Sequence, residues 1–89
     1  MSMAEYAINE VVERLFKAYR YAMDTAIDIA RGEYSIEAIH DIALAIADEI
    51  NYVMDAMEKL FNVKIPNEIR DKMMELNEEY EKIEQEQEL

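Results

Sequence analysis

The sequence predicts an all-α protein in which a long antiparallel helical hairpin is followed by a third amphipathic helix. The chain of 89 residues has one glycine and one proline, although 52% of its residues are hydrophobic. This is too little turn-forming sequence for a β protein. Three long stretches also repeat apolar residues at steps of three and four, the period of one helical face. We expect one domain over residues 1–89, with helices at about 3–31, 36–61 and 67–85 and a frayed acidic tail at 86–89.

The clearest helical pattern covers residues 35–61. Ser35 fits an N-cap there, because its hydroxyl can accept from the first free backbone N–H groups. Residues 42–47 are apolar all round, so we expect this part to be covered from several sides. The main seam, predicted to be a buried face, consists of Ile36, Ile39, Ala43, Ile46, Ile50, Val53, Met57 and Leu60.

The first helix has a wider apolar arc made of two adjoining stripes. Ser2 and Glu5 fit a capping box at its start, and Gly32 fits a left-handed cap at its end. So wide an arc predicts two packing partners: helix two, and either helix three or another subunit. One stripe is Ala4, Ile8, Val11, Leu15, Ala18, Ala22, Thr25 and Ile29, and the other is Val12, Phe16, Tyr19, Met23, Ala26 and Ala30.

The third helix has a narrower stripe, typical of a helix packed on one side only. Pro66 either opens this helix at its first position or precedes a cap at Asn67. The stripe consists of Ile65, Ile69, Met73, Leu76, Tyr80 and Ile83.

A small chain without cysteine needs further stabilisation. A folded chain of this size buries only about 60 to 65% of its unfolded surface. Since disulfides are excluded, a partner subunit is the expected supplement. We therefore predict a homodimer with a four-helix core decorated by the third helices, and a monomeric three-helix bundle is the alternative.

The charge pattern bears on partners. The net charge is −12, divided as −1 over residues 1–31, −6 over 32–61 and −5 over 62–89. Such a surface repels phosphates and anionic lipids, so direct binding to nucleic acid or to a membrane is not expected. The negative charge has two interpretations. One is that it only keeps the protein soluble, and the other is that it attracts a basic protein partner. The first residues show no secretory signal, which favours a cytoplasmic location.

A basic cluster of Arg14, Lys17 and Arg20 lies on the predicted polar face of helix one, with Tyr21 alongside. Basic side chains near aromatic rings can contact phosphate. On a chain this acidic, we expect them instead to form ion pairs. The predicted partners are Glu10, Glu13 and Asp24 in the same helix, or acids of helix two.

Glu37 and His40 are weak candidates for metal ligands. The Glu-x-x-His spacing places both side chains on one helical face, as in di-iron carboxylate bundles. The motif lies in the first turn of the helix, however, where the helix dipole stabilises a glutamate carboxylate without any metal. We predict no metal site and no cofactor, with His40 half-exposed beside Glu37 and Asp41.

Spaced carboxylates on helix two form a second candidate. Acidic helices bind Mg²⁺ in all-α nucleotide pyrophosphatases, and the pairs Asp55-x-x-Glu58 and Glu75-x-x-Glu78 approximate their pattern. Nucleotide-holding residues are missing around these pairs, so a solvated face is expected. The acids on this side are Glu37, Asp41, Asp48 and Asp55.

Two further features have open interpretations. Asn51 flanks the main seam, where a polar residue either sets the register of an assembly or lies at the boundary with water. Seven methionines, Met54, Met57, Met73 and Met74 among them, either fill the core or form an adaptable binding surface.

These patterns predict a small acidic non-catalytic interaction protein. It would be an assembly subunit, an adaptor, or an inhibitor of a basic partner, including a viral protein that mimics nucleic acid. No catalytic residues are predicted, because Ser2 and Ser35 fit caps and His40 has no hydroxyl partner. The alternative is a metal-binding ferritin-like or Mg-dependent nucleotide-hydrolysing bundle. The predicted contact residues are Phe16, Tyr19, Met23, Ile46, Ile50, Val53, Asp41, Asp48 and Asp55.

Overall fold

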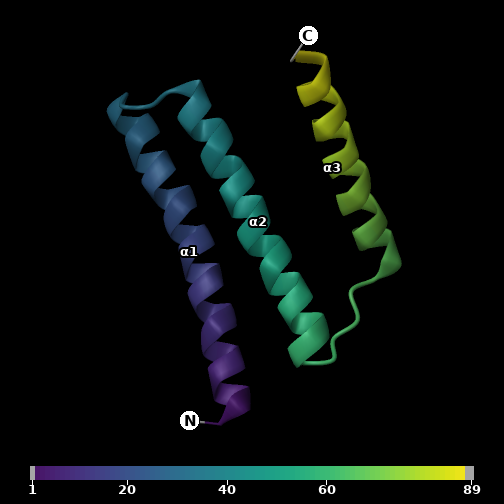
Figure 1. Cartoon of the computed structure of the whole chain (residues 1–89). Coiled ribbons are helices and arrows are strands. Elements are labelled where there is room, and N and C mark those ends of the chain that lie inside the picture. The colour runs from purple at the N-terminus through teal and green to yellow at the C-terminus, as the bar shows by residue number, and fades with distance from the viewer. Residues whose placement is uncertain (1, 88–89) are drawn as a thin grey trace.

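The computed structural model describes residues 2–87, and within them the chain forms three helices without strands. The helices are α1 (Met3–Arg31), α2 (Ile36–Leu60) and α3 (Asn67–Gln87). The predicted all-α class is confirmed, and α1 and α2 lie side by side as an antiparallel hairpin (Figure 1). Residues 86 and 87 are helical rather than frayed, and the rest of the predicted tail lies outside the described residues.

Local capping explains where the hairpin helices begin and where α1 ends. Ser2 Oγ accepts from the Glu5 N–H at 3.1 Å, and Ser35 Oγ accepts from the Ala38 N–H at 3.0 Å. Gly32 ends α1 with φ at 75°, a left-handed conformation that glycine adopts without a Cβ penalty. These three predicted caps are confirmed.

The connection between α2 and α3 uses two signals that the sequence prediction missed. Asn62 adopts φ at 56°, and the Val63 N–H bonds the Met57 carbonyl at 3.1 Å. Asparagine tolerates this left-handed conformation better than most residues, so α2 ends one residue before the predicted Phe61. Pro66 precedes α3, and its carbonyl accepts from the N–H groups of Ile69 and Arg70.

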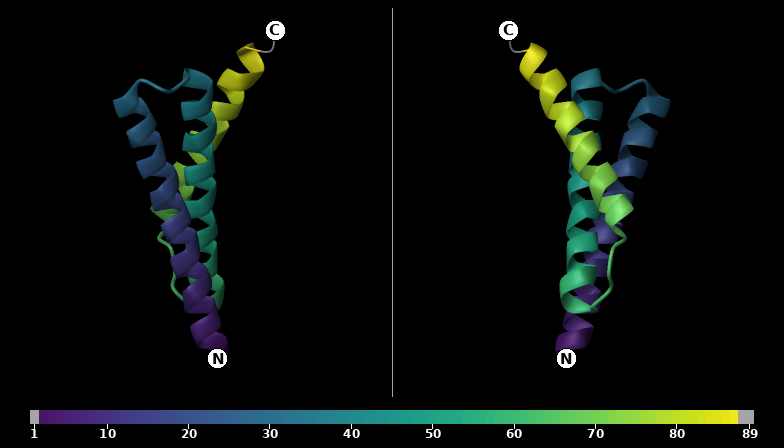
Figure 2. Two further views of the ribbon diagram at one scale, coloured as in Figure 1. Left: turned by 90° about the vertical axis from the view of Figure 1, so that its left-hand side faces the viewer. Right: turned by 90° about the vertical axis from the view of Figure 1, so that its right-hand side faces the viewer.

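The three helices form one twisted layer. α3 lies on the side of α2 that faces away from α1 (Figure 1). The layer measures 46 × 32 × 18 Å, and Figure 2 shows it edge-on, with the helix axes splayed. Within residues 2–87, no Cα atom of α3 comes within 8 Å of one in α1 or α2. The alternative of a closed three-helix bundle is therefore wrong for this chain, and α3 is not the second partner of α1.

Few side chains of residues 2–87 are buried. The buried apolar residues are Ala7, Ala18, Val53 and Ala56. The main seam of α2, predicted to be buried, is buried only in part, since Val53 is 7% exposed whereas Ile36 is 83% and Ile50 41% exposed. None of the helices in residues 2–87 is both long and apolar enough to cross a lipid bilayer.

Candidate functional site

The contact between α1 and α2 uses faces that overlap the predicted apolar stripes only in part, since Ala18 of α1 and Val53 of α2 belong to both. On α1, the buried and half-buried side chains form a single heptad stripe. This stripe includes Arg14 and Tyr21, which were assigned to the polar face. On α2, the buried stripe is Glu49, Val53 and Ala56. The α1 stripe is Ala7, Val11, Arg14, Ala18, Tyr21, Thr25 and Asp28.

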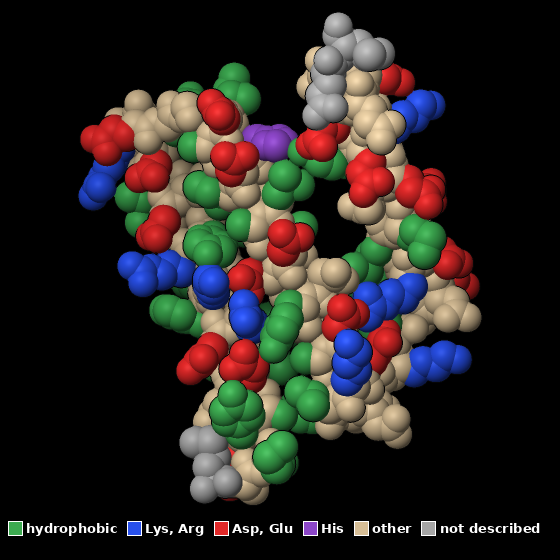
Figure 3. Space-filling view, in the orientation of Figure 1, with side chains coloured by type: hydrophobic (Ala, Val, Ile, Leu, Met, Phe, Trp, Pro, Cys, Tyr) green, Lys and Arg blue, Asp and Glu red, His purple; other side chains and the backbone are tan. Residues whose placement is uncertain are grey.

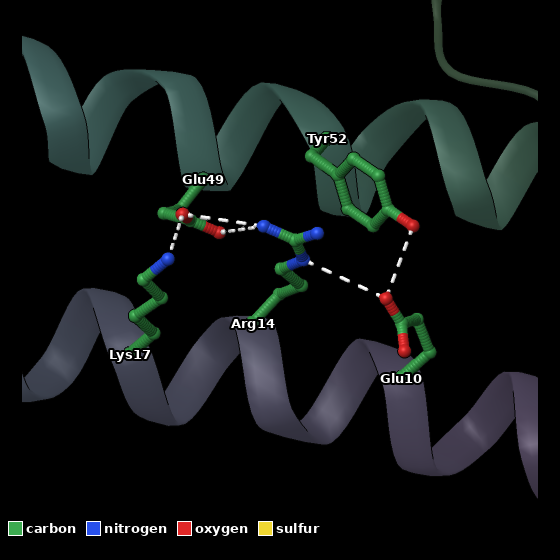
Figure 4. Close-up of polar contacts among 5 residues, drawn as sticks. All are labelled: Glu10, Arg14, Lys17, Glu49 and Tyr52. Carbon is green, nitrogen blue, oxygen red and sulfur yellow. Dashed lines mark hydrogen bonds and ion pairs between the residues drawn. The ribbon is translucent and has the colours of Figure 1, made fainter.

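A buried carboxylate lies at the centre of this contact. Glu49 of α2 is only 9% exposed and points towards α1 (Figure 4). Its carboxylate lies 3.4 Å from Arg14 Nη1 and 3.4 Å from Lys17 Nζ. Two cations therefore compensate for the desolvation of one carboxylate, the arrangement that a buried charge requires.

Arg14 joins this carboxylate to a second group of polar contacts (Figure 4). Its guanidinium lies 4.3 Å from the centroid of the Tyr52 ring, and its Nε lies 3.7 Å from Glu10 Oε1. Tyr52 Oη donates to the same Glu10 oxygen at 3.4 Å. The chain Glu49–Arg14–Glu10–Tyr52 thus connects the helices twice and sets their register.

The predicted ion pairs are confirmed for all three members of the basic cluster and for all but one of their predicted partners in helix one. Arg14 and Lys17 bind Glu49 of helix two, Arg14 also binds Glu10, and Arg20 lies 3.5 Å from Asp24. The exception is Glu13, which has no ion pair within residues 2–87.

These contacts favour the charged forms of both cations. Desolvation lowers the pKa of Arg14, but its hydrogen bond to Glu49 and the negative charge there outweigh this effect and raise the pKa. The pKa of Lys17 is also raised, by hydrogen bonding and charge interactions with Tyr21 and Glu49. Both side chains therefore remain positive opposite the buried carboxylate.

α3 is attached to α2 through Arg70. This guanidinium lies 2.8 Å from Asp55 Oδ1, 2.8 Å from Glu58 Oε1 and 3.3 Å from Asn51 Oδ1. Its hydrogen bond to Glu58 is the main cause that raises the pKa of Arg70. Asp55 and Glu58, compared above with a magnesium site, thus hold a guanidinium, and Asn51 binds α3.

A second contact joins α2 to α3 at the other end. His40 Nε2 lies 2.8 Å from Tyr80 Oη, and His40 Nδ1 lies 3.2 Å from Asp41 Oδ1. Tyr80 Oη donates to Glu84 Oε2 at 2.8 Å, a bond that raises the pKa of Tyr80. Both ring nitrogens of His40 therefore have partners in the chain. Glu37 and His40 belong to no group of three potential metal-binding side chains within residues 2–87.

Replacing Arg70 with methionine should release α3 from α2. An isolated helix of this length is marginal in water, so its backbone amides should lose protection once the contact is removed. Hydrogen exchange over residues 69–80 should accelerate roughly tenfold, while α1 and α2 keep their protection. Lys72→Met is the matched control, because Lys72 is in the same helix and, among residues 2–87, pairs only with Glu75. Equal acceleration in both variants would show that Arg70 does not hold α3.

A large apolar surface remains uncovered on one side of the layer. Successive helical residues are about 100° apart, so Lys17 flanks the α2-facing stripe of α1 on one side and Ile8 and Leu15 flank it on the other. We call this uncovered surface the open apolar face. Its exposed residues are Ile8, Val12, Leu15 and Tyr19 of α1 and Ile36 and Ile50 of α2, and the half-buried Ile46 of α2 also belongs to it.

The same geometry places the α2 residues of the open apolar face. The stripe facing α1 includes Glu49 and Val53, and the residues facing α3 include Asn51 and Asp55. These two groups lie on opposite sides of α2, and Ile50 lies between them. The charged side chains that gather over the helices in Figure 3 belong to the other side of the layer.

The predicted contact residues fall into three environments. The α1 residues are exposed, Tyr19 by 63%, and Ile50 is exposed while Ile46 is half-buried. Val53 is only 7% exposed and belongs to the packing inside the hairpin, so it is not available to a partner. Among the acids, Asp55 binds Arg70, and Asp41 and Asp48 are exposed. The exposed α1 residues are Phe16, Tyr19 and Met23.

Sequence reasoning missed the burial of Glu49, because a single acid beside the seam resembles any solvated carboxylate. The signal that could have located it is the pair Arg14 and Lys17, two cations one turn apart that need a common acceptor.

Comparison of the chain with family models, with curated proteins and with solved structures finds no match.

Proposed function

We propose that the protein is a non-catalytic assembly protein in which two copies pair through the open apolar face. Stacking the two layers would produce a six-helix dimer, with the charged side of each chain directed outwards. The observation that carries this proposal is the amount of surface that a single chain leaves uncovered.

The accessible surface of the chain is 7371 Å². A compact monomer of 10.5 kDa exposes about 5,400 Å². The chain therefore exposes roughly 1,900 Å² more than its mass requires, close to what each subunit of an obligate homodimer buries. Large apolar side chains such as Leu15, Tyr19 and Ile50 contribute to this excess.

The chemistry of the open apolar face favours a second copy as its occupant. The face contains no charged residue, so two acidic chains can approach through it without placing carboxylates opposite one another. Two identical faces that pair about a twofold axis form a closed dimer, which leaves no apolar face free to bind further copies. The open apolar face of a second copy also has the same length as the face that it would cover.

Pairing of this kind supports a role in protein interaction. The carboxylates on the outer side of the layer would remain in water, where they attract basic proteins and repel nucleic acids and anionic lipids. The proposed function is therefore an acidic assembly subunit or adaptor whose apolar side is used for self-association.

Sedimentation equilibrium tests this proposal on the unmodified chain. At about 10 µM protein, we expect a mass twice that of the 10.5 kDa chain. Raising the salt concentration should leave the dimer intact or tighten it, because salt screens the repulsion between two chains of net charge −12. A single species with the mass of one chain at every salt concentration would overturn the proposal.

A further inference from the structure

A second apolar surface lies between α2 and α3, away from the α1–α2 contact. It is a groove of about 590 Å³. Its apolar lining includes Leu44 and Ala47 of α2 and Met73 and Met74 of α3. Figure 3 shows the molecule hollowed between these two helices. The groove exists because α3 is joined to α2 by long side chains, Arg70 at one end and His40 with Tyr80 at the other, and stands off in between.

We propose that this groove binds an amphipathic helix from a basic partner protein. A volume of several hundred cubic ångströms fits a row of aliphatic side chains from one helical face. The methionines on the α3 side have flexible, polarisable side chains that adapt to different apolar surfaces. The groove opens to solvent between the Arg70 bridge and the bridge of His40 with Tyr80, so the apolar side chains of a helix lying over its mouth can enter it.

The charges around the groove determine which kind of helix it binds. Asp48 lines the groove and forms no hydrogen bond or ion pair within residues 2–87. Asp41 and Glu84 lie near the His40 end. Among the described lining residues, Arg70 is the only cation, and its guanidinium is already bound to Asp55 and Glu58. The rim is therefore negative and favours lysine or arginine beside the apolar stripe of the bound helix.

This binding does not depend on the proposed dimer. The groove lies on the α3-facing side of α2, and its α2 residues Leu44, Ala47 and Asp48 are not part of the open apolar face. The two surfaces also differ in their expected response to salt. Screening should weaken a contact between opposite charges and should not weaken the pairing of two acidic chains.

The probe is a fluorescein-labelled 18-residue synthetic peptide with leucine at helical spacing and lysine elsewhere. Fluorescence anisotropy with the full chain should show micromolar binding that weakens about tenfold between 50 and 300 mM NaCl. A peptide with glutamate in place of each lysine should not bind. Equal binding of the two peptides, or no binding of the lysine peptide at about 100 µM, would overturn the proposal.

Two matched leucine variants identify the surface that binds the peptide. Leu44 lines the groove and is 37% exposed, whereas Leu15 belongs to the open apolar face and is 45% exposed. Leu44→Glu should weaken peptide binding at least tenfold, and Leu15→Glu should leave it within about twofold. Circular dichroism checks that both variants keep the helical content of the unmodified chain.

The outcomes separate this inference from the dimer proposal. Loss of peptide binding in Leu15→Glu with retention in Leu44→Glu would place the peptide on the open apolar face and overturn the groove proposal. Groove binding by a chain that sediments as a monomer would support the groove proposal and overturn the dimer alone.

Discussion

Replacing Ile50 with glutamate is expected to convert the proposed dimer into monomers. Ile50 is 41% exposed in the single chain and lies on the α2 part of the open apolar face. In a symmetric dimer each substitution counts twice, so two aliphatic contacts are lost and two carboxylates are desolvated. The combined loss of more than about 4 kcal/mol corresponds to a dissociation constant raised roughly a thousandfold.

Leu44→Glu is the control for this experiment. It introduces the same charge into α2 at a half-exposed leucine that lines the groove instead of the open apolar face. Sedimentation equilibrium of both variants should show Ile50→Glu at the mass of one chain and Leu44→Glu at twice that mass. If Ile50→Glu remains dimeric, or if both variants dissociate equally, the open apolar face is not the dimer interface.

Replacing Glu49 with lysine is expected to have the largest effect on folding. The substitution places a third positive charge beside Arg14 and Lys17 at a position that is only 9% exposed. Breaking a buried pair in this way costs about 3 to 5 kcal/mol. The cost here falls below that range, at about 2 to 3 kcal/mol, because Arg14 and Lys17 are partly exposed and can turn towards solvent. The corresponding fall in Tm is roughly 10 °C or more.

Asp48→Lys is the matched control, because it makes the same charge change one residue earlier on the exposed side of α2. Its Tm should stay within a few degrees of the unmodified chain, since an exposed substitution usually changes stability by less than about 0.5 kcal/mol. The measurement is thermal unfolding followed by circular dichroism at equal protein concentrations. Equal Tm values for the two variants would mean that Glu49 does not hold the hairpin together.

The same pair of variants tests the register of the hairpin. Glu49 and Tyr52 contact α1 three residues apart, at Arg14 and Glu10, so loss of the first contact should also disturb the second (Figure 4). The amides around Glu10 should then exchange faster in Glu49→Lys and remain protected in Asp48→Lys.

Much of the fold was predictable because helix formation depends on neighbouring residues. The caps at Ser2, Ser35 and Gly32 act within a few positions of their own backbone groups, so the sequence locates them directly. The left-handed conformation of Asn62, just beyond the end of α2, was not predicted, since asparagine is common both in loops and in left-handed caps.

The orientation of the helices was not predictable in the same way. The apolar stripes were expected to be buried, but only a few of their members are: the hairpin packs through Ala18 and Val53 of these stripes, through Ala56, and through the ion pairs of Glu49. Close approach of two backbones and pairing of a buried carboxylate depend on residues 30 or more positions apart. Periodicity within one helix contains no information about such pairs.

The sequence by itself determined that this protein consists of three helices, with an uncharged stripe along each and an excess of carboxylates elsewhere. Only the tertiary structure decided which stripes are covered. In that structure Glu49 lies between Arg14 and Lys17, and Arg70 attaches α3 to the side of α2 that faces away from α1. Ile50 is left uncovered. The physical reason is that local hydrogen bonding sets the helices, whereas their packing depends on the balance between small-residue contacts and charge pairs across the chain.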